Sequence, residues 1–375
     1  MPPTVAYVHD WIVFLGWAEE VLRMLIRKYG SEDAKIFTLF SPRKSLSVDE
    51  EQIPIVTALP RRCNQLIWWW NTQRWLKRLF DYRNLMPLYP LLCRLLRKKI
   101  EQADSDLLVI SSFAAAKNVV EEKDNEKNRG KKKVILYLHS PMQYIRENHD
   151  EYLQKIRGAK GAIFKRVTRY LRKWDKRSRH YDEVFANSKY TAVCAKKYYH
   201  LEATVWYPEM PEVYRITDVI VQPRDYFVYV GRLVRFIREV DRIIELANLS
   251  KVPLLILGSW PDEDCLKSLA WPTVIFVWQV DDLTQKIDIL KQARGLINLA
   301  KESCGMATME ALALGVPVFG YDDGGTIERI DDSNWVLVWS KDIETLTEQM
   351  KIFLAKKRDR TRIQANFREK MNYKQ

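Results

Sequence analysis

Residues 295–318 read GLINLAKESCGMATMEALALGVPV and show the pattern that decides the fold. A short apolar run, Gly295–Leu299, is followed by a polar loop, by a helix pattern over Met309–Leu314 and by a second apolar run, Val316–Gly320. Apolar strands joined by a helix are typical of a parallel sheet that is buried on both faces. The segment therefore predicts a βαβ unit.

The same alternation runs through the rest of the chain in two series, which meet near residues 208–225. The predicted strands of the first series are Val5–Val8, Leu107–Ser111, Val134–Leu138, Glu183–Asn187 and Val205–Tyr207. The second series adds Phe227–Val230, Leu254–Leu257 and Val274–Val277 to the two runs above. Helix patterns lie at Ala18–Tyr29, Val240–Asn248 and Leu283–Gln292. Because a chain of 375 residues exceeds the size of most single cores, two α/β domains are predicted.

Composition excludes several classes of protein. Apolar residues make up 47% of the chain and charged residues 29%, which is the balance of a globular protein. No apolar stretch reaches the ~18 residues that span a bilayer. The five cysteines are scattered without paired spacing, which argues against a disulfide framework or a zinc site. The N-terminus lacks the basic segment and cleavage site of a secretory signal, so a cytoplasmic location is expected.

The net charge of +13 is concentrated in two blocks. Residues 61–100 contain ten Lys or Arg against one acid, and residues 153–180 contain eleven against one. The first block interleaves its cations with aromatic residues such as Trp68–Trp70. Such helices suit an anionic membrane surface. A solvated helix face is the plainer alternative, and nucleic acid is not expected as a partner because no nucleic-acid-binding signature accompanies the charge.

The polar loop of the opening segment suggests a binding site. Glu302 would lie at the end of a strand, and the chain would enter a helix around Gly305–Ala307. The free N–H groups at a helix start favour an anion. Glu310, about one turn further, can face the same crevice. On spacing alone, however, two glutamates eight residues apart are common on solvated surfaces.

Further motifs stand in the order found in the family 4 glycosyltransferases, and the chain resembles that family over nearly its whole length. The motifs are Val8–Trp11 with the following Gly16, Ile110–Ser112, Tyr137–Tyr144, Ala186–Ser188, Val230–Val234, Glu302-x7-Glu310 and Gly324-Gly325-x-x-Glu328. The resemblance implies a retaining enzyme with the GT-B fold, in which two Rossmann-like domains face each other across a cleft. Residues 1–207 would form the acceptor-side domain and residues 208–355 the nucleotide-sugar domain. Residues 356–375 would form a C-terminal helix that returns to the first domain or is simply solvated.

The resemblance also assigns roles to single residues. The Gly16 turn would face the donor diphosphate, and Arg232 would neutralise that diphosphate. His139 and Glu302 would be catalytic, with His139 near the transferred sugar and Glu302 on its hydroxyls. Glu310 would hold the ribose. Without the resemblance, His139 reads as an ordinary core histidine and Arg232 as a surface arginine.

The second phosphate cation departs from the family pattern. The family usually has a lysine five residues after the diphosphate arginine, where this chain has Ile237. Arg238 is the candidate replacement. The backbone N–H groups of Gly305, Met306 and Ala307 would add positive charge at the leaving diphosphate, so neither a metal nor a cofactor is expected.

The implied reaction is transfer of a hexose from a nucleoside-diphosphate sugar to a glycan or lipid-linked acceptor at the inner face of a membrane. A His-x-Pro-Met-x-Tyr pattern from His139 to Tyr144 is similar to that of bacterial mannosyltransferases of surface-glycan synthesis. A catalytically inactive binding or scaffolding protein of the same fold is the alternative.

Tryptophan and glycine each occur 13 times, although glycine is normally far commoner. Four tryptophans stand where the family has glycine: Trp17, Trp260, Trp278 and Trp335. Glycine at such turns usually serves a positive φ or a close backbone approach, which would strain tryptophan. We hypothesise that UGA codons, translated as glycine in the source organism, have been written as tryptophan. If the tryptophans are real, the inactive alternative gains weight.

Overall fold

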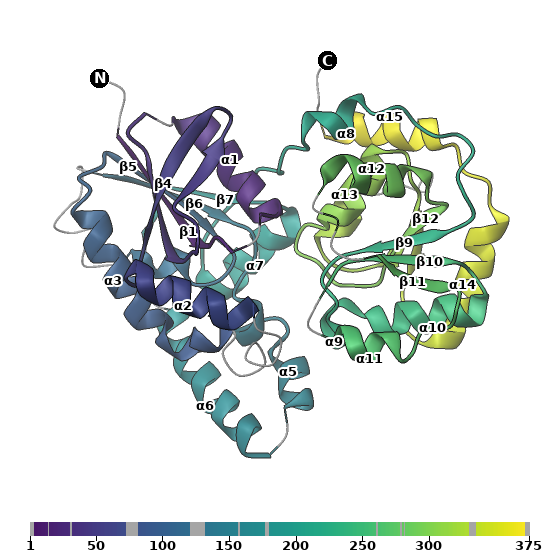
Figure 1. Cartoon of the computed structure of the whole chain (residues 1–375), viewed down its shortest axis with the longest axis horizontal. Helices are drawn as coiled ribbons and strands as arrows, with labels where there is room; N and C mark the ends of the chain where they lie inside the picture. The colour runs from purple at the N-terminus through teal and green to yellow at the C-terminus, as the bar shows by residue number, and fades with distance from the viewer. Residues whose placement is uncertain are drawn as a thin grey trace. The chain divides into compact units, whose positions relative to one another are not determined.

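The computed structural model describes residues 4–13, 15–30, 32–72, 82–120, 132–156, 158–176, 180–259, 262–277, 280, 282–329 and 335–371. The chain divides into two compact units, Met1–Glu209 and Met210–Gln375. The first unit ends at Glu209, two residues after residue 207, where the first domain was predicted to end. Each unit is an α/β structure with its own sheet, coloured purple to teal and teal to yellow in Figure 1.

The N-terminal unit contains an eight-stranded sheet in the order β3-β4-β2-β1-β5-β6-β7-β8. The strands are β1 (Val5–Trp11), β2 (Lys35–Phe40), β3 (Ser45–Val48), β4 (Glu51–Thr57), β5 (Leu107–Ser112), β6 (Lys133–Leu138), β7 (Glu183–Ala186) and β8 (Thr204–Val205). Adjacent strands are parallel except β3 and β4, which form an antiparallel hairpin. The carboxyl ends of β1, β5 and β6 therefore lie side by side.

Helices cover both faces of this sheet (Figure 1). They are α1 (Trp17–Tyr29), α2 (Arg61–Thr72), η2 (Tyr82–Leu88), α3 (Tyr89–Glu101), η3 (Ala116–Val119), η4 (Gln143–Ile145), α5 (His149–Lys155), α6 (Gly158–Asp175) and α7 (Lys189–Tyr199). Apolar residues spaced three or four apart, such as Leu22, Leu25 and Ile26, pack α1 on one face. Leu92 and Leu96 pack α3 on the other face.

The C-terminal unit contains a six-stranded parallel sheet in the order β11-β10-β9-β12-β13-β14. Its strands are β9 (Phe227–Val230), β10 (Leu254–Leu257), β11 (Val274–Val277), β12 (Gly295–Asn298), β13 (Val318–Tyr321) and β14 (Trp335–Val338). Its helices are α8 (Glu212–Ile216), α9 (Arg235–Arg238), α10 (Val240–Ser250), α11 (Glu263–Lys267), α12 (Leu283–Gln292), α13 (Met306–Ala313), η5 (Gly325–Arg329), α14 (Ile343–Ala355) and α15 (Arg360–Lys370). In Figure 1, α12, α13 and α15 lie on one side of the sheet and α10 and α11 on the other.

All ten predicted strands are confirmed, with ends shifted by up to three residues. The strands missing from the prediction are β2, β3, β4 and β14. Among them, β3 and β4 are mixed polar and apolar because they form the exposed edge of the sheet, so they lack the continuous apolar run of a central strand.

The C-terminal helix α15 packs against α13 within the C-terminal unit. It is therefore not simply solvated, whereas a return of residues 356–375 to the N-terminal domain stays a prediction. Arg360 is 5% exposed and donates hydrogen bonds to the carbonyls of Gly315 at 3.1 Å, Ala293 at 3.1 Å and Lys291 at 2.7 Å. Gln364 donates to the carbonyl of Ala313 at 2.7 Å. These bonds anchor the helix to the turns around β12 and α13.

Two of the four tryptophans at family glycine positions lie in described elements. Trp17 is the first residue of α1 and Trp335 the first residue of β14. Neither has a positive φ, so the expected backbone strain is absent at both. Trp260 and Trp278 lie outside the described residues.

Within the described ranges, every helix is too short or too polar to cross a membrane.

Candidate functional site

A cluster of two histidines and a serine lies at the carboxyl ends of three adjacent strands of the N-terminal unit. His9 is on β1, Ser111 on β5 and His139 directly after β6, and the sheet pairs His9 with Ser111. Ser111 Oγ is 3.0 Å from His9 Nδ1 and 2.8 Å from His139 Nε2. We call these three residues the histidine cluster. Ligands of parallel sheets bind at this end of the strands, so the cluster lies where chemistry is expected.

His139 is neutral in this environment. Burial and, to a smaller extent, the neighbouring His9 lower its pKa to about 3. The edges of Phe113 and Tyr137 face its ring, with centroids at 6.1 and 5.1 Å. His139 can therefore form hydrogen bonds near neutral pH but is a weak acceptor of a full proton.

Asp10 fixes the loop beside the histidine cluster. Its buried carboxylate accepts hydrogen bonds from four consecutive backbone N–H groups: Phe113 at 2.6 Å, Ala114 at 2.9 Å, Ala115 at 2.5 Å and Ala116 at 2.6 Å. Successive amides turned toward one carboxylate form a nest that is specific for an anion. This structural role was missed because residues 10 and 113 are adjacent only in the folded sheet.

Gly16 is the N-cap of α1, and its N–H donates to Glu19 Oε2 at 2.9 Å. Glu19 is only 6% exposed, and its Oε1 is 3.9 Å from His9 Nε2. A carboxylate at this helix start offsets the charge of the macrodipole. The predicted diphosphate contact at Gly16 stays a prediction, and a phosphate there would share the helix start with Glu19.

Glu302 and Arg238, two predicted site residues, form an ion pair in the C-terminal unit. Asn298 at the end of β12 donates from Nδ2 to Glu302 Oε2 at 2.8 Å and to Thr308 Oγ1 on α13 at 3.1 Å. Glu302 also forms a β-bridge with Gly324. The Glu302 carboxylate is thus held by Asn298 on β12 and by Arg238 on α9. Thr308 on α13 in turn holds Asn298. Asn298 was missed as a site residue, although its position at the strand end was a usable signal.

Tyr229 on β9 lies close to both Arg232 and Arg238. The Tyr229 hydroxyl donates to the backbone carbonyl of Arg232 at 3.0 Å. Burial raises the pKa of Tyr229 above its usual value, with smaller electrostatic effects from Arg238, Glu302 and Arg232. Three predicted site residues are therefore close enough to act on one phenol. The side chain of Arg232 is exposed, as binding to a diphosphate would require.

Gly305 starts α13 in a conformation that needs glycine. Its φ of +74° is in the left-handed region, and a Cβ would lie 2.5 Å from Thr326 Oγ1. Such a position strains any L-residue with a side chain. Met306 and Ala307 follow as the first residues of α13, so the predicted helix start is confirmed and its amides point out of the first turn.

Glu310 is 1% exposed and has partners from two other helices. It is ion-paired with Lys286 on α12 and accepts a hydrogen bond from the Tyr214 hydroxyl on α8 at 3.0 Å. Burial, and secondly Glu310, raise the pKa of Tyr214. Glu302 thus lies in the loop before α13 and Glu310 on α13 itself, and the two carboxylates have different partners. Contact of Glu310 with a ribose stays a prediction.

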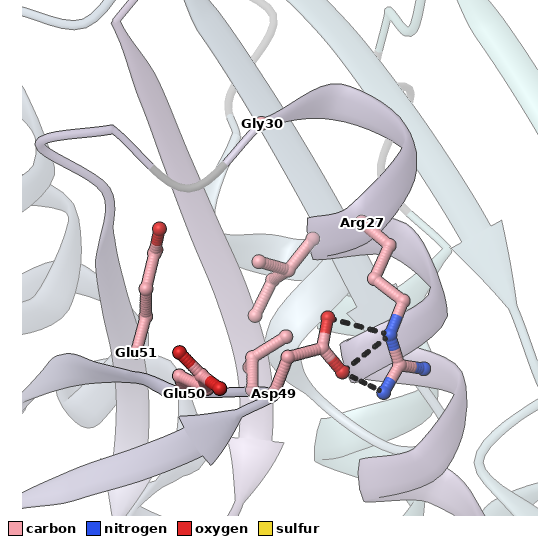
Figure 2. Close-up of a pocket in the computed structure, with 7 residues that line it drawn as sticks. Arg27, Gly30, Asp49, Glu50 and Glu51 are labelled. Carbon is pink, nitrogen blue, oxygen red and sulfur yellow. Dashed lines mark hydrogen bonds and ion pairs between the residues drawn. The ribbon is translucent and has the colours of Figure 1, made fainter.

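A pocket of the N-terminal unit lies at the other end of α1 from the histidine cluster (Figure 2). Arg27 and Gly30 line it together with Asp49, Glu50 and Glu51 from the turn between β3 and β4. Figure 2 shows the Arg27 guanidinium facing the Asp49 carboxylate, with Nη2 and Oδ1 2.7 Å apart. Since this cation is already paired, the pocket adds nothing to the predicted site.

The two basic blocks form helices that expose apolar and cationic side chains together. On α6, Ile163 is 63% and Tyr170 53% exposed, and the exposed Arg166 and Lys173 lie three residues after each. On α2, Trp69 is 53% exposed. We call the exposed side of α6 the α6 face. Residues 73–81, 157 and 177–179 of these blocks lie outside the described residues.

Part of the C-terminal unit matches the model of a known family. Residues 212–370 match the model of the family described as glycosyl transferases group 1. This range contains Arg232, Arg238, Glu302 and Glu310. A comparison with curated protein sequences finds no match to the chain.

Solved structures resemble the whole chain at low sequence identity. A sucrose-phosphate synthase from Thermosynechococcus elongatus has a TM-score of 0.68 and 15% identity, covering 98% of this chain and 94% of its own. Anabaena HepE in complex with UDP and glucose has a TM-score of 0.61 and 15% identity, covering 99% and 100%. The apo lipopolysaccharide outer core galactosyltransferase WaaB has a TM-score of 0.60 and 14% identity, covering 99% and 96%. These likenesses confirm the predicted α/β fold with two Rossmann-like domains, the GT-B fold. Within it, residues 212–370 are similar to the glycosyl transferases group 1 model.

Proposed function

We propose that the protein is a retaining glycosyltransferase that moves a hexose from a nucleoside-diphosphate sugar to a glycan or lipid-linked acceptor at the cytoplasmic face of a membrane. The observation that carries this proposal is the cluster of Arg238, Glu302 and Asn298 beside the start of α13. It lies within the residues that match glycosyl transferases group 1.

The geometry supports different roles for the arginine cations and for the Glu302 carboxylate. The leaving nucleoside diphosphate develops negative charge, which the Arg232 and Arg238 guanidinium groups and the amides of Met306 and Ala307 would stabilise. Glu302, held by Asn298 and Arg238, would accept hydrogen bonds from hydroxyls of the donor sugar. These groups supply positive charge from the chain itself, so we infer that the reaction needs no metal.

The donor is a nucleoside-diphosphate hexose, with mannose as the first sugar to test. HepE has been solved with UDP and glucose and with UDP-glucose, so UDP-glucose is the second. A screen of GDP-mannose, UDP-glucose and UDP-N-acetylglucosamine by thermal shift, followed by product analysis in the presence of EDTA, would identify the donor and test the metal-free mechanism. The anomeric configuration of the product would test retention.

Matched variants connect the activity to the site. Glu302→Gln and Arg238→Gln should each abolish transfer. The control is Arg242→Gln, because Arg242 also pairs with a glutamate, Glu245, on the surface of the same unit at 3.0 Å. If wild-type protein binds none of the three donors, the inactive scaffolding alternative is favoured instead.

The α6 face suits the interface of an anionic membrane. Ile163 and Tyr170 lie seven residues apart, on one side of the helix, with Arg166 and Lys173 alongside. Apolar side chains would enter the headgroup region while cations meet anionic lipids. Co-sedimentation with phosphatidylglycerol vesicles should fall strongly in the double variant Ile163→Ser, Tyr170→Ser.

Controls for membrane binding are available on the same unit. Val193 on α7 is 65% exposed, so Val193→Ser removes an equally exposed apolar side chain away from the basic blocks. It should bind vesicles like wild type. Equal binding to neutral phosphatidylcholine vesicles, or no effect of the α6 substitutions, would refute the membrane assignment.

A further inference from the structure

Glu19, His9, Ser111 and His139 form a continuous line of buried polar groups from the start of α1 to the end of β6. Their exposed fractions are 6%, 0%, 0% and 9%. The separations along the line are 3.9 Å from Glu19 Oε1 to His9 Nε2, 3.0 Å from His9 Nδ1 to Ser111 Oγ and 2.8 Å from Ser111 Oγ to His139 Nε2. The positions of the protons on this line can be worked out by counting donors.

Ser111 has one hydroxyl proton and two imidazole neighbours, so it can donate to only one of them. The other imidazole must donate its own N–H to Ser111 Oγ. Two arrangements are possible. Either His139 donates from Nε2 and His9 accepts at Nδ1, or His9 donates from Nδ1 and His139 accepts at Nε2. The arrangement determines which ring nitrogen of His139 is unprotonated.

Glu19 favours the first arrangement. Its Oε2 accepts a hydrogen bond from the Gly16 N–H, and its Oε1 lies 3.9 Å from His9 Nε2, beyond hydrogen-bond distance but close enough for its charge to act on that nitrogen. A carboxylate only accepts, so it favours a proton on the nitrogen that faces it. His9 then carries its proton on Nε2 and accepts from Ser111 at Nδ1. Ser111 in turn accepts from His139 Nε2, which leaves His139 Nδ1 with a free lone pair.

The surroundings keep His139 in this form. Phe113 contacts both imidazoles edge-on, with centroids at 5.5 Å from His9 and 6.1 Å from His139. Burial holds the pKa of His139 at about 3, so the ring stays neutral and has one proton to place. Nδ1 of His139 has no hydrogen-bond partner among the described residues, and 9% of the residue remains exposed.

We propose that Glu19, acting through His9 and Ser111, fixes His139 as the tautomer with its proton on Nε2 and so presents Nδ1 as a hydrogen-bond acceptor for a sugar hydroxyl. Glu19, His9 and Ser111 are positioning residues in this scheme. The sugar hydroxyl rests on the proposed function, whereas the tautomer rests on this chain's contacts alone.

The decisive substitution is Glu19→Gln, with Glu20→Gln as its matched control. The Gly16 N–H still needs an acceptor, so the new amide turns its oxygen to Gly16 and its NH2 to His9 Nε2. The side chain then presents the positive end of an amide dipole in place of a carboxylate, which favours an unprotonated Nε2 on His9. His9 would donate from Nδ1 instead, which reverses the line and moves the His139 proton to Nδ1. Glu20 is the next carboxylate on α1 and pairs with Arg23 instead, so its substitution changes the charge equally without touching the line.

The readout is the 15N NMR spectrum of the full-length protein, in which protonated and bare imidazole nitrogens are well separated. The chain has only five histidines, and His139→Gln assigns the signal. Wild type and Glu20→Gln should show the proton on Nε2 of His139, and Glu19→Gln should show it on Nδ1. A wild-type proton on Nδ1, or an unchanged spectrum in Glu19→Gln, would overturn the proposal.

A second variant covers the case in which Glu19→Gln does not fold. Ser111→Ala breaks the line between the two imidazoles, so His139 should give averaged signals of both tautomers, and an unchanged spectrum would count against the proposal. In transfer assays Glu19→Gln should lower kcat by about 3- to 10-fold, the worth of one net hydrogen bond, without changing the KM of the donor. If wild type transfers no sugar, the proposed function fails, while the spectra still decide the tautomer.

Discussion

His139 should make the N-terminal unit sensitive to acid. In the folded protein its pKa is lowered to about 3 by burial and by His9, whereas in an unfolded chain it is about 6.5. Above pH 6.5 both states are neutral and the shift contributes nothing to the pH dependence. Below that pH the unfolded chain takes up the proton first, so stability falls as the pH drops from 6.5 toward 3.

The magnitude at pH 5 follows from these values. The unfolded histidine is 1.5 pH units below its pKa there, and each unit is worth about 1.36 kcal/mol, so the loss is about 2 kcal/mol relative to pH 8. His139→Gln removes the titration and keeps a polar group near Ser111. The variant should therefore lose about 2 kcal/mol less than wild type between pH 8 and pH 5.

Urea unfolding at both pH values, followed by circular dichroism and tryptophan fluorescence, measures this difference. The two units can unfold separately, so the analysis uses the transition that His139→Gln moves at pH 8. The control is His180→Gln, since the side chain of His180 is 61% exposed. If wild type and His139→Gln lose the same stability on acidification, the inference that His139 is held neutral by burial is refuted.

Three further outcomes are expected. Asp10→Asn should lower the free energy of unfolding by about 3 kcal/mol, because an amide cannot accept all four N–H groups that the carboxylate holds; Asp49→Asn, at an exposed ion pair, is its control in the same denaturant assay. Gly305→Ala should abolish donor binding and destabilise the protein more than Gly158→Ala, because both glycines have left-handed φ but a Cβ at Gly158 meets open space; equal thermal shifts in the two variants would contradict the role of Thr326. Sequencing the gene should find UGA codons at the four tryptophans in family glycine positions, which are Trp17, Trp260, Trp278 and Trp335. UGG codons there would end the recoding hypothesis.

The recoding hypothesis has lost the argument from a strained backbone at two of its four positions. The counts of 13 tryptophans and 13 glycines stand, but the backbone at Trp17 and Trp335 is ordinary helix and strand. A positive φ cannot be deduced from a family glycine alone, since glycine is also used where a backbone or ligand approaches closely. The codons are therefore the direct test.

The amino-acid sequence by itself determined the elements and their order. Apolar runs such as Phe227–Val230 and Leu254–Leu257 became central strands at the predicted residues, because burial on both faces of a parallel sheet demands unbroken apolar stretches. The start of α13 directly after Gly305 was likewise predicted from the local pattern. Periodicity and turn residues act within a few positions of the chain, so they can be read before folding.

Only the tertiary structure decided which distant residues meet. Residues 9, 111 and 139 form one polar line because β1, β5 and β6 are neighbours in the sheet, and strand order is not encoded in any local pattern. The partners of Glu310, which are Lys286 and Tyr214, and the docking of α15 on α13 were hidden for the same reason. Contacts between residues far apart in sequence depend on how the elements pack, and packing is a property of the whole core.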